Sequence, residues 1–255
     1  MTIQEHDVNT IGERLAAVQE RIAAAARQAG RDPGDVQLIA VTKTHPADVV
    51  RSAFAGGCRV FGENRVQEAE GKIDALADVR ASVQWHLIGH LQRNKAKKAA
   101  ALFDLVHSLD SLSLAQTLDR HAATAGRRLP VLLQVNMSGE ANKEGFALAG
   151  WQDDHAVLDR FVADVEQIVA LPHLDVQGLM TVAPWSDDPG VVQPVFRATR
   201  LLRDELARRF SSTDWRHLSM GMTGDFELAI VEGATLVRIG RAIFGERDKR
   251  DKMTR

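Results

Sequence analysis

Apolar positions along the chain follow two periods, one typical of amphipathic helices and one typical of buried strands. Near the N-terminus, apolar residues recur every three or four positions and predict a helix with one buried face: Ile11, Leu15, Val18 and Ile22. Eight short apolar, β-rich runs then predict strands at 36–43, 58–63, 83–89, 104–109, 131–137, 174–180, 215–221 and 236–240. Longer segments of helical period separate them, among them 46–57, 64–77 and 194–210.

This alternation of strands and helices predicts a parallel sheet with helices packed outside it. Eight such units in 255 residues favour an α/β fold with one closed (β/α)8 TIM barrel preceded by an extra helix. Residues 1–255 would then form a single domain. An open doubly wound sheet is the alternative, but the first strand runs into "TKTHP" instead of the glycine-rich turn of a dinucleotide site.

Composition and charge narrow the class of protein. The net charge of −2, with acids and bases interspersed, gives no reason to expect a nucleic-acid partner. No stretch approaches the roughly 20 apolar residues that span a bilayer, and no secretory signal is visible. The single cysteine, Cys58, precludes an internal disulfide and fits a reducing compartment. We therefore expect a cytoplasmic protein, and the absence of clustered His and Cys motifs predicts no metal site.

Candidate functional residues lie where the predicted strands end, because barrel sites are built at the carboxyl ends of the strands. They are Lys43, Asn64, His86, Ser219, Arg238 and Gly240. Lys43 is either a solvated strand end or an amine held for chemistry. An amine that attacks a carbonyl must be neutral, and desolvation or the nearby charge of Arg238 would lower its pKa.

The loops after the seventh and eighth strands suit a phosphate group. Residues 219–225 and 238–245 supply small residues, a hydroxyl and open backbone at the usual phosphate position of such barrels. A phosphorylated aldehyde bound there could reach Lys43 and form a Schiff base. Pyridoxal phosphate fits this description, and so does a sugar phosphate in a lysine-dependent aldolase. The aldolase would need a buried carboxylic acid near Lys43, for which Glu63 is the candidate at a strand end.

Five motifs in order resemble the YggS/PROSC family of pyridoxal-phosphate-binding homeostasis proteins: "VTKTHP", "FGENRVQE", "WHLIGHLQRNK", "LSMGMTGDFELAI" and "VRIGRAIFGER". The resemblance implies a barrel similar to the N-terminal domain of alanine racemase, of the fold-type III pyridoxal phosphate proteins. It implies that Lys43 is the Schiff-base lysine and that Arg238 donates a hydrogen bond to the pyridine nitrogen. Ser219 and the backbone at Gly240 and Arg241 would hold the phosphate, with Asn64 beside the ring.

Position 241 departs from the family pattern, which usually has Thr or Ser there. Arg241 removes a hydroxyl contact to the phosphate. Either the backbone N–H suffices, or the guanidinium replaces the hydroxyl with a charge-assisted contact.

The chain lacks a component that racemases of this fold use. Because arginine can only donate, an arginine at the pyridine nitrogen leaves the cofactor a weaker electron sink, and such racemases add a second base. That base is a tyrosine from a separate domain of the partner subunit. This sequence has no tyrosine, and we expect no such domain after the last strand.

We therefore expect a carrier or buffer of pyridoxal phosphate in vitamin B6 homeostasis, with apo enzymes as possible recipients. Without the second domain's dimer interface, we expect a monomer. A weak amino-acid racemase is the alternative, with His86 as a conceivable second base.

Overall fold

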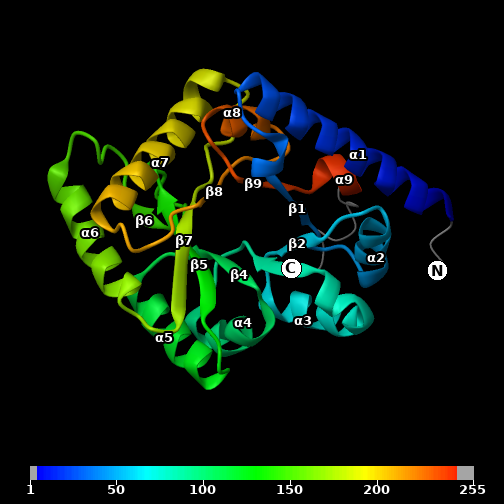
Figure 1. Cartoon of the computed structure of the whole chain (residues 1–255), viewed down its shortest axis with the longest axis horizontal. Helices are drawn as coiled ribbons and strands as arrows, with labels where there is room; N and C mark the ends of the chain where they lie inside the picture. Colours follow the sequence, from blue (N-terminus) through cyan, green and yellow to red (C-terminus); the bar gives the residue numbers. More distant parts are fainter. Residues whose placement is uncertain (1–4, 246–255) are drawn as a thin grey trace.

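Strands form a closed, all-parallel barrel in the part of the chain that the computed structural model describes, residues 5–245 (Figure 1). The barrel strands are β1 (Gln37–Val41), β2 (Val60–Glu63), β3 (Gln84–Leu87), β4 (Leu105–Leu109), β5 (Leu129–Asn136), β7 (Leu174–Met180), β8 (His217–Ser219) and β9 (Leu236–Ile239). Each pairs with the next in chain order, and β9 pairs back onto β1, so the ring has no open edge. The predicted (β/α)8 barrel is confirmed, and the open doubly wound sheet is wrong.

Helices cover the outside of this ring (Figure 1). They are α1 (Glu5–Gln28), α2 (Ala47–Ala55), α3 (Val66–Ala75), α4 (Ala96–Leu102), α5 (Leu112–Thr124), α6 (His155–Val169), α7 (Pro189–Arg209), α8 (Phe226–Val231) and α9 (Arg241–Phe244). Short 3-10 helices lie at η1 (Pro33–Asp35), η2 (Ala77–Ser82) and η3 (Arg93–Lys95). The extra N-terminal helix α1 packs against α2, α8 and α9, and the four apolar positions that predicted it are buried.

The structure contains one strand that the sequence did not predict, and one helix begins earlier than predicted. The short strand β6 (Phe146–Ala147) pairs with β5 outside the ring, and no apolar run predicted it. Helix α7 begins at Pro189, not at Pro194. The Asp188 carboxylate accepts the Gly190 N–H at 2.8 Å, so an acidic N-cap followed by proline sets the true start. Pro194 lies inside the helix, where it removes one backbone donor.

The barrel interior divides into an apolar layer and a polar layer. A separate apolar cluster fills the interior with one residue from most strands: Ile39, Val60, Leu105, Leu132, Met180 and Leu236. Side chains two residues apart on a strand face the same side, so the next inward positions toward the carboxyl ends include His107 on β4 and Arg238 on β9. By strand register, His86 is the partner of Gly62 and Ser219 is the partner of Met180. The side chains of His86 and Ser219 therefore also face the barrel interior. The carboxyl half of the interior is therefore polar.

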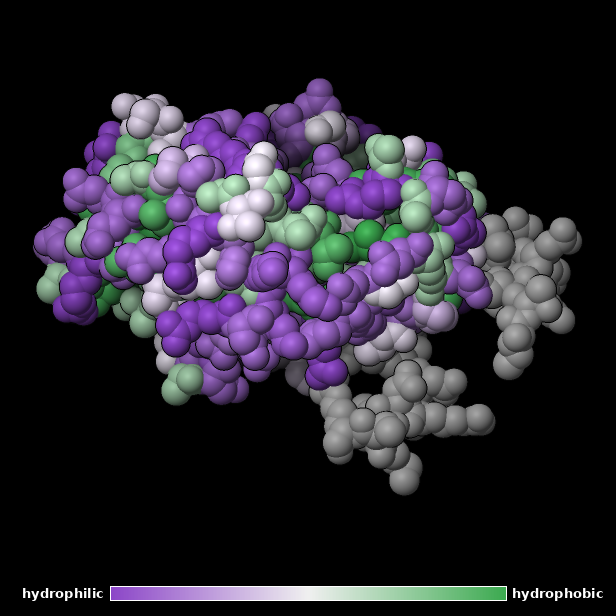
Figure 2. Space-filling view, turned by 90° about the horizontal axis from the view of Figure 1, so that it is seen from below, coloured by the Kyte–Doolittle hydropathy of each residue, from purple (hydrophilic) through white to green (hydrophobic). Residues whose placement is uncertain are grey.

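The outer surface is largely hydrophilic. Figure 2 shows a face on which hydrophilic residues predominate, with hydrophobic residues visible between them. Among the helices of residues 5–245, none combines the length and apolar character needed to cross a bilayer.

Candidate functional site

Lys43 lies in a tight backbone turn directly after β1. The His45 N–H donates to the Thr42 carbonyl oxygen at 3.0 Å and closes a four-residue turn with Lys43 second and Thr44 third. Thr44 has φ +69°, and within residues 5–245 it is the one non-glycine residue with positive φ. This third position normally takes glycine or asparagine, and a β-branched residue there stores about 1–3 kcal/mol of strain. Strain of this kind concentrates at functional sites and needs surrounding contacts to hold it.

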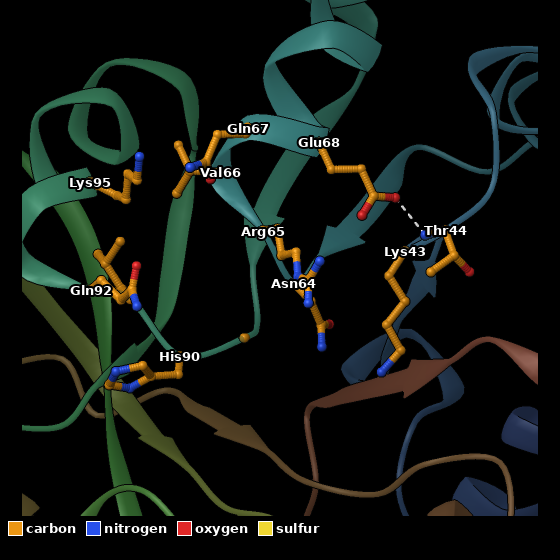
Figure 3. Close-up of a pocket in the computed structure, with 12 residues that line it drawn as sticks. Lys43, Thr44, Asn64, Arg65, Val66, Gln67, Glu68, His90, Gln92 and Lys95 are labelled. Atoms are coloured by element: carbon orange, nitrogen blue, oxygen red, sulfur yellow. Dashed lines mark hydrogen bonds between the residues drawn. The ribbon is translucent and has the colours of Figure 1, made fainter. Parts of the chain in front are cut away.

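Lys43 and Asn64 line the same pocket at the carboxyl ends of β1, β2 and β3 (Figure 3). The pocket has a volume of about 890 Å³, and its other walls come from the "GENRVQE" and "GHLQRNK" segments, with Gln92 and Lys95 on the side away from Lys43. Gly89 allows the β3 loop to approach Asn64. A Cβ atom at position 89 would lie 2.5 Å from the Asn64 carbonyl oxygen. Asparagine is a common helix N-cap, but the N-cap of α3 is Arg65 and not Asn64.

Arg238 begins a chain of buried polar side chains inside the barrel. Its Nη1 donates to Ser219 Oγ at 2.7 Å and its Nη2 donates to the Thr181 carbonyl oxygen at 2.9 Å. Ser219 Oγ lies 2.8 Å from His107 Nδ1, and His107 Nε2 lies 3.1 Å from His86 Nδ1. We call Arg238, Ser219, His107 and His86 the inner chain. It joins strands β9, β8, β4 and β3 across the barrel.

Burial dominates the electrostatics of the inner chain. It lowers the pKa of His86 to about 3, and it lowers the pKa of His107 well below the ordinary value, so both imidazoles are neutral near pH 7. Burial also lowers the pKa of Arg238 to about 10, which leaves the guanidinium charged. The described residues place no carboxylate in an ion pair with Arg238, and Asp225 acts on it only at longer range. The barrel mouth therefore contains a buried positive charge without a counter-ion in contact.

A second buried network lies outside the barrel wall, between β1, β2 and α3. Lys72 Nζ donates to Glu63 Oε1, to Glu68 Oε1 and to the Thr42 carbonyl oxygen, each at 2.7 Å. The Thr42 hydroxyl donates to Glu63 Oε1 at 2.5 Å, and the Thr44 N–H donates to Glu68 Oε1. We call Thr42, Glu63, Glu68 and Lys72 the outer network. Burial raises the pKa of Glu63, and the Lys72 charge opposes this rise.

The outer network also bears on the aldolase alternative. That hypothesis needs a carboxylic acid beside Lys43. The Glu63 carboxylate instead contacts Thr42 and Lys72, on the helix side of the wall. Its position gives the aldolase hypothesis no support.

Gly240 and Arg241 lie where β9 ends and α9 begins. Gly240 is the N-cap of α9, and a Cβ there would approach the Val41 carbonyl oxygen to 3.3 Å. This close packing holds the start of α9 against the end of β1. The His45 and Phe244 rings, with centroids 5.0 Å apart, further join the Lys43 turn to α9. The Arg241 side chain is exposed.

The structure thus places the predicted residues in two groups toward the carboxyl ends of the barrel strands. Lys43 and Asn64 share the pocket, and Arg238 binds Ser219, whose side chain is fully buried. Sequence reasoning missed His107 on the inner side of the wall and Lys72 and Glu68 on the outer side. The alternation of Leu105, His107 and Leu109 on an inward-facing strand was the available signal for His107. Nothing in the helical pattern of α3 distinguished Lys72 from a surface lysine.

One group of potential metal ligands lies at the rim, although the sequence predicted no metal site. His90 Nδ1 is 3.1 Å from Asp110 Oδ2 and 4.0 Å from Glu144 Oε2. His90 and Glu144 are exposed, and their contacts are those of ordinary surface ion pairs. This group carries no assignment.

Comparisons with known proteins agree with the five sequence motifs. The family model of the alanine racemase N-terminal domain matches residues 14–248. The pyridoxal phosphate homeostasis protein of Aquifex aeolicus (strain VF5) is 43% identical over 235 residues, which cover 92% of this chain and 97% of the relative. The protein of the same name from Escherichia coli (strain K12) is 40% identical over 243 residues, covering 94% and 98%.

Solved structures give the same picture. PipY of Synechococcus elongatus PCC7942 with pyridoxal phosphate bound is 39% identical, with a TM-score of 0.78 over 92% of this chain and all of that chain. An alanine racemase of Clostridium difficile 630, at 13% identity and a TM-score of 0.68, shares the fold over 91% of this chain and 60% of its own. The chain therefore belongs to the alanine racemase N-terminal domain family and, within it, to the pyridoxal phosphate homeostasis proteins that its motifs resemble.

Proposed function

We propose that this protein binds pyridoxal 5'-phosphate through a Schiff base on Lys43 and serves as a buffer or carrier of the cofactor. The names of the relatives and the bound cofactor of PipY support the choice of ligand. The observation that carries the proposal is the placement of Lys43 and Arg238 on neighbouring strands, toward the same end of the barrel. Ile39 and Arg238 are register partners on β1 and β9, and the Lys43 turn begins directly after the carboxyl end of β1.

The donor set of the site fits this cofactor. A guanidinium that is 5% exposed and has no carboxylate in contact favours an acceptor or anion beside it. The two bonds to Ser219 and Thr181 use two of its five N–H donors. The pyridine nitrogen is a suitable acceptor, and Arg238 would hold it unprotonated. Ser219 and the N–H groups at Gly240 and Arg241 would bind the phosphate, and Asn64 would lie beside the ring.

The same residues favour binding over turnover. When bound, the cofactor supplies an aldehyde for covalent attachment and an electron sink, which Arg238 keeps weak because arginine does not give up its proton. His86 was the conceivable second base. Its pKa of about 3 and its bond to His107 make it a poor proton acceptor near pH 7, where a general base is effective with a pKa close to the working pH. We therefore favour a non-catalytic role over a weak racemase.

This binding role also indicates how the protein would act in the cell. A reversible covalent site can load when free cofactor is abundant and release it to apo enzymes of pyridoxal phosphate. We place the activity in the cytoplasm, in keeping with the single buried thiol of Cys58, and expect a monomer. Size-exclusion chromatography with light scattering tests the oligomeric state, and a dimer would correct it.

The visible absorption spectrum tests the central proposal. The purified protein, incubated with pyridoxal phosphate, should develop the yellow band of a Schiff base, and Lys43→Ala should not. Lys95→Ala is the matched control, because it removes the other lysine amine that lines the pocket. Borohydride reduction and peptide mapping should place the label on Lys43. A colourless parent protein, or a band that Lys43→Ala keeps, would overturn the proposal.

A further inference from the structure

We infer that Glu68 and Lys72 are positioning residues for Lys43, and that they hold its turn in the conformation that reacts with the cofactor. The inference rests on the proposed function, in which Lys43 forms the Schiff base. It concerns residues of α3 that contact the backbone around Lys43, and it gives the outer network a role in cofactor binding.

Both peptide groups that flank the Lys43 Cα atom are held by this network. The carbonyl of the Thr42–Lys43 peptide accepts a hydrogen bond from Lys72 Nζ at 2.7 Å. The N–H of the Lys43–Thr44 peptide donates to Glu68 Oε1. Glu68 and Lys72 are themselves paired at 2.7 Å, one turn apart on α3. A single ion pair therefore fixes the backbone on each side of the reactive lysine.

Lys72 has little freedom to make other contacts. Its side chain is 7% exposed, and its three bonds to Glu63, Glu68 and Thr42 use all three ammonium protons. Glu63 is fully buried on β2, so Lys72 joins β2 and β1 to α3 at one point. The next residue along the chain, just after β2, is Asn64, which lines the same pocket as Lys43. The network thus anchors two walls of the site together.

The strained conformation of Thr44 explains why such an anchor is needed. A threonine at φ +69° would relax to negative φ if its N–H lost its acceptor, and the Lys43–Thr44 peptide would rotate. That rotation would turn the Lys43 side chain from its place at the end of β1. Glu68 opposes it by accepting the Thr44 N–H, and Lys72 holds Glu68 in place.

Hydrogen exchange without cofactor is the first test. Glu68→Ala should speed exchange of the Thr44 amide by about tenfold or more, because its acceptor is gone. Glu68→Gln keeps an oxygen acceptor and should retain most of the protection. Glu70→Ala is the matched control: Glu70 lies on the same helix but pairs with Lys98 at 2.6 Å, away from β1. Equal exchange at Thr44 in Glu68→Ala and Glu70→Ala would overturn the inference.

The rate of covalent capture of pyridoxal phosphate by Lys43 is the second test. Glu68→Ala should slow capture by about tenfold relative to Glu70→Ala, the population change expected when a strained turn is free to relax. Thr44→Gly removes the penalty of positive φ. We therefore expect Glu68→Ala to slow capture much less when Thr44→Gly is also present. If Glu68 served folding alone, Glu68→Ala would lower the melting temperature, but its effect on the capture rate would not depend on Thr44→Gly.

The outcomes separate this inference from the proposed function. If the parent captures no cofactor, the proposed function fails, while Thr44 exchange still decides whether Glu68 holds the turn. If the parent captures cofactor but Glu68→Ala captures it at the rate of Glu70→Ala, the proposed function stands and the positioning role is wrong. Equal slowing by Glu68→Ala with and without Thr44→Gly would also contradict the role assigned to the strained turn.

Discussion

The inner chain is buried and the outer network mostly so, and both are polar and close to the end of β1, yet their charges are arranged in opposite ways. In the outer network, the Lys72 ammonium contacts two carboxylates and a carbonyl oxygen. In the inner chain, the Arg238 guanidinium contacts a hydroxyl and a carbonyl oxygen, and the described residues add no contacting carboxylate. The outer network pairs its cation with carboxylates, whereas the inner chain leaves its cation without a contacting carboxylate.

This difference separates a structural role from a binding role. The buried Lys72 ammonium uses all three of its donors within the outer network, so it has no proton left for a ligand, and it holds the strands and helix that it joins. A buried cation with neutral partners costs free energy of folding that an acceptor or anion can recover. We therefore expect changes in the outer network to affect stability first, and changes in the inner chain to affect cofactor affinity first.

Acid should produce the largest difference, through the neutral histidines of the inner chain. The pKa of His86 falls from 6.5 to about 3 on folding, and that of His107 is also lowered. Below pH 6.5 the unfolded chain binds protons that the folded chain does not, so stability is lost as the pH falls from 6.5 towards 3. Each histidine contributes a slope of up to about 1.4 kcal/mol per pH unit, measured as the free energy of unfolding in urea at several pH values.

A histidine substitution isolates this slope from other groups. The raised pKa of Glu63 acts in the opposite sense, since its contribution is lost as the pH rises. His86→Gln should remove the contribution of one histidine to the slope of the unfolding free energy against pH. His155→Gln, at an exposed position, should leave that slope unchanged. An unchanged slope in His86→Gln would show that His86 does not stay neutral in the folded protein as the pH falls.

Lys72→Met should give the next largest effect, this time on the outer network. It leaves the buried Glu63 carboxylate without its cation, a change that costs about 3–5 kcal/mol in comparable buried pairs. Lys98→Met breaks an exposed pair with Glu70 and should cost less than about 1 kcal/mol. Urea unfolding at pH 7 measures both. Equal losses would mean that the outer network is no more important to folding than a surface pair.

The barrel itself was predictable because its signals are local. Apolar runs bounded by helical segments located every barrel strand, with ends that differ from the observed ones by one to two residues in most cases. Lys43 and Arg238 could be placed at one end of the barrel because strand ends meet there in any such fold. The start of α7 was wrong because two prolines, Pro189 and Pro194, carry the same N-terminal signal, and only the Asp188 cap distinguishes them.

The two networks were not predictable, because they depend on contacts between distant residues. Ser219 and His107 are 112 positions apart in the chain, and their contact requires the register of the whole ring. Lys72 has the sequence environment of a surface helix residue, and its burial depends on how α3 packs against β1 and β2. The positive φ of Thr44 also has no sequence signal, since threonine disfavours it.

Arg238→Met should change stability little and affinity greatly. Removing a buried charge relieves its desolvation and forfeits two hydrogen bonds, so we expect a net change within about 1 kcal/mol in the absence of cofactor. In the proposed site Arg238 donates to the pyridine nitrogen, and losing that charged donor should weaken binding of pyridoxal phosphate by roughly 10- to 100-fold. Urea unfolding and equilibrium dialysis measure the two effects. A loss of stability as large as that of Lys72→Met would remove the distinction between the networks.

The smallest expected effect is a shift of protons within the inner chain. Ser219 Oγ has one proton, and Arg238 can only donate to it. If the hydroxyl donates to the cofactor's phosphate, His107 must also donate to Oγ, which requires the proton on Nδ1. His107 Nε2 then accepts from His86 Nδ1–H.

Nitrogen-15 NMR of labelled histidines should therefore show both rings as Nδ1–H tautomers when pyridoxal phosphate is bound. In Ser219→Ala the oxygen acceptor for His107 Nδ1–H is gone, so bound cofactor should no longer select this tautomer. If both rings carry the proton on Nε2 in the loaded protein, the Ser219 hydroxyl faces His107 and not the phosphate. Phosphate binding would then rest on the backbone at Gly240 and Arg241, and the inner chain would act on the cofactor through Arg238 alone.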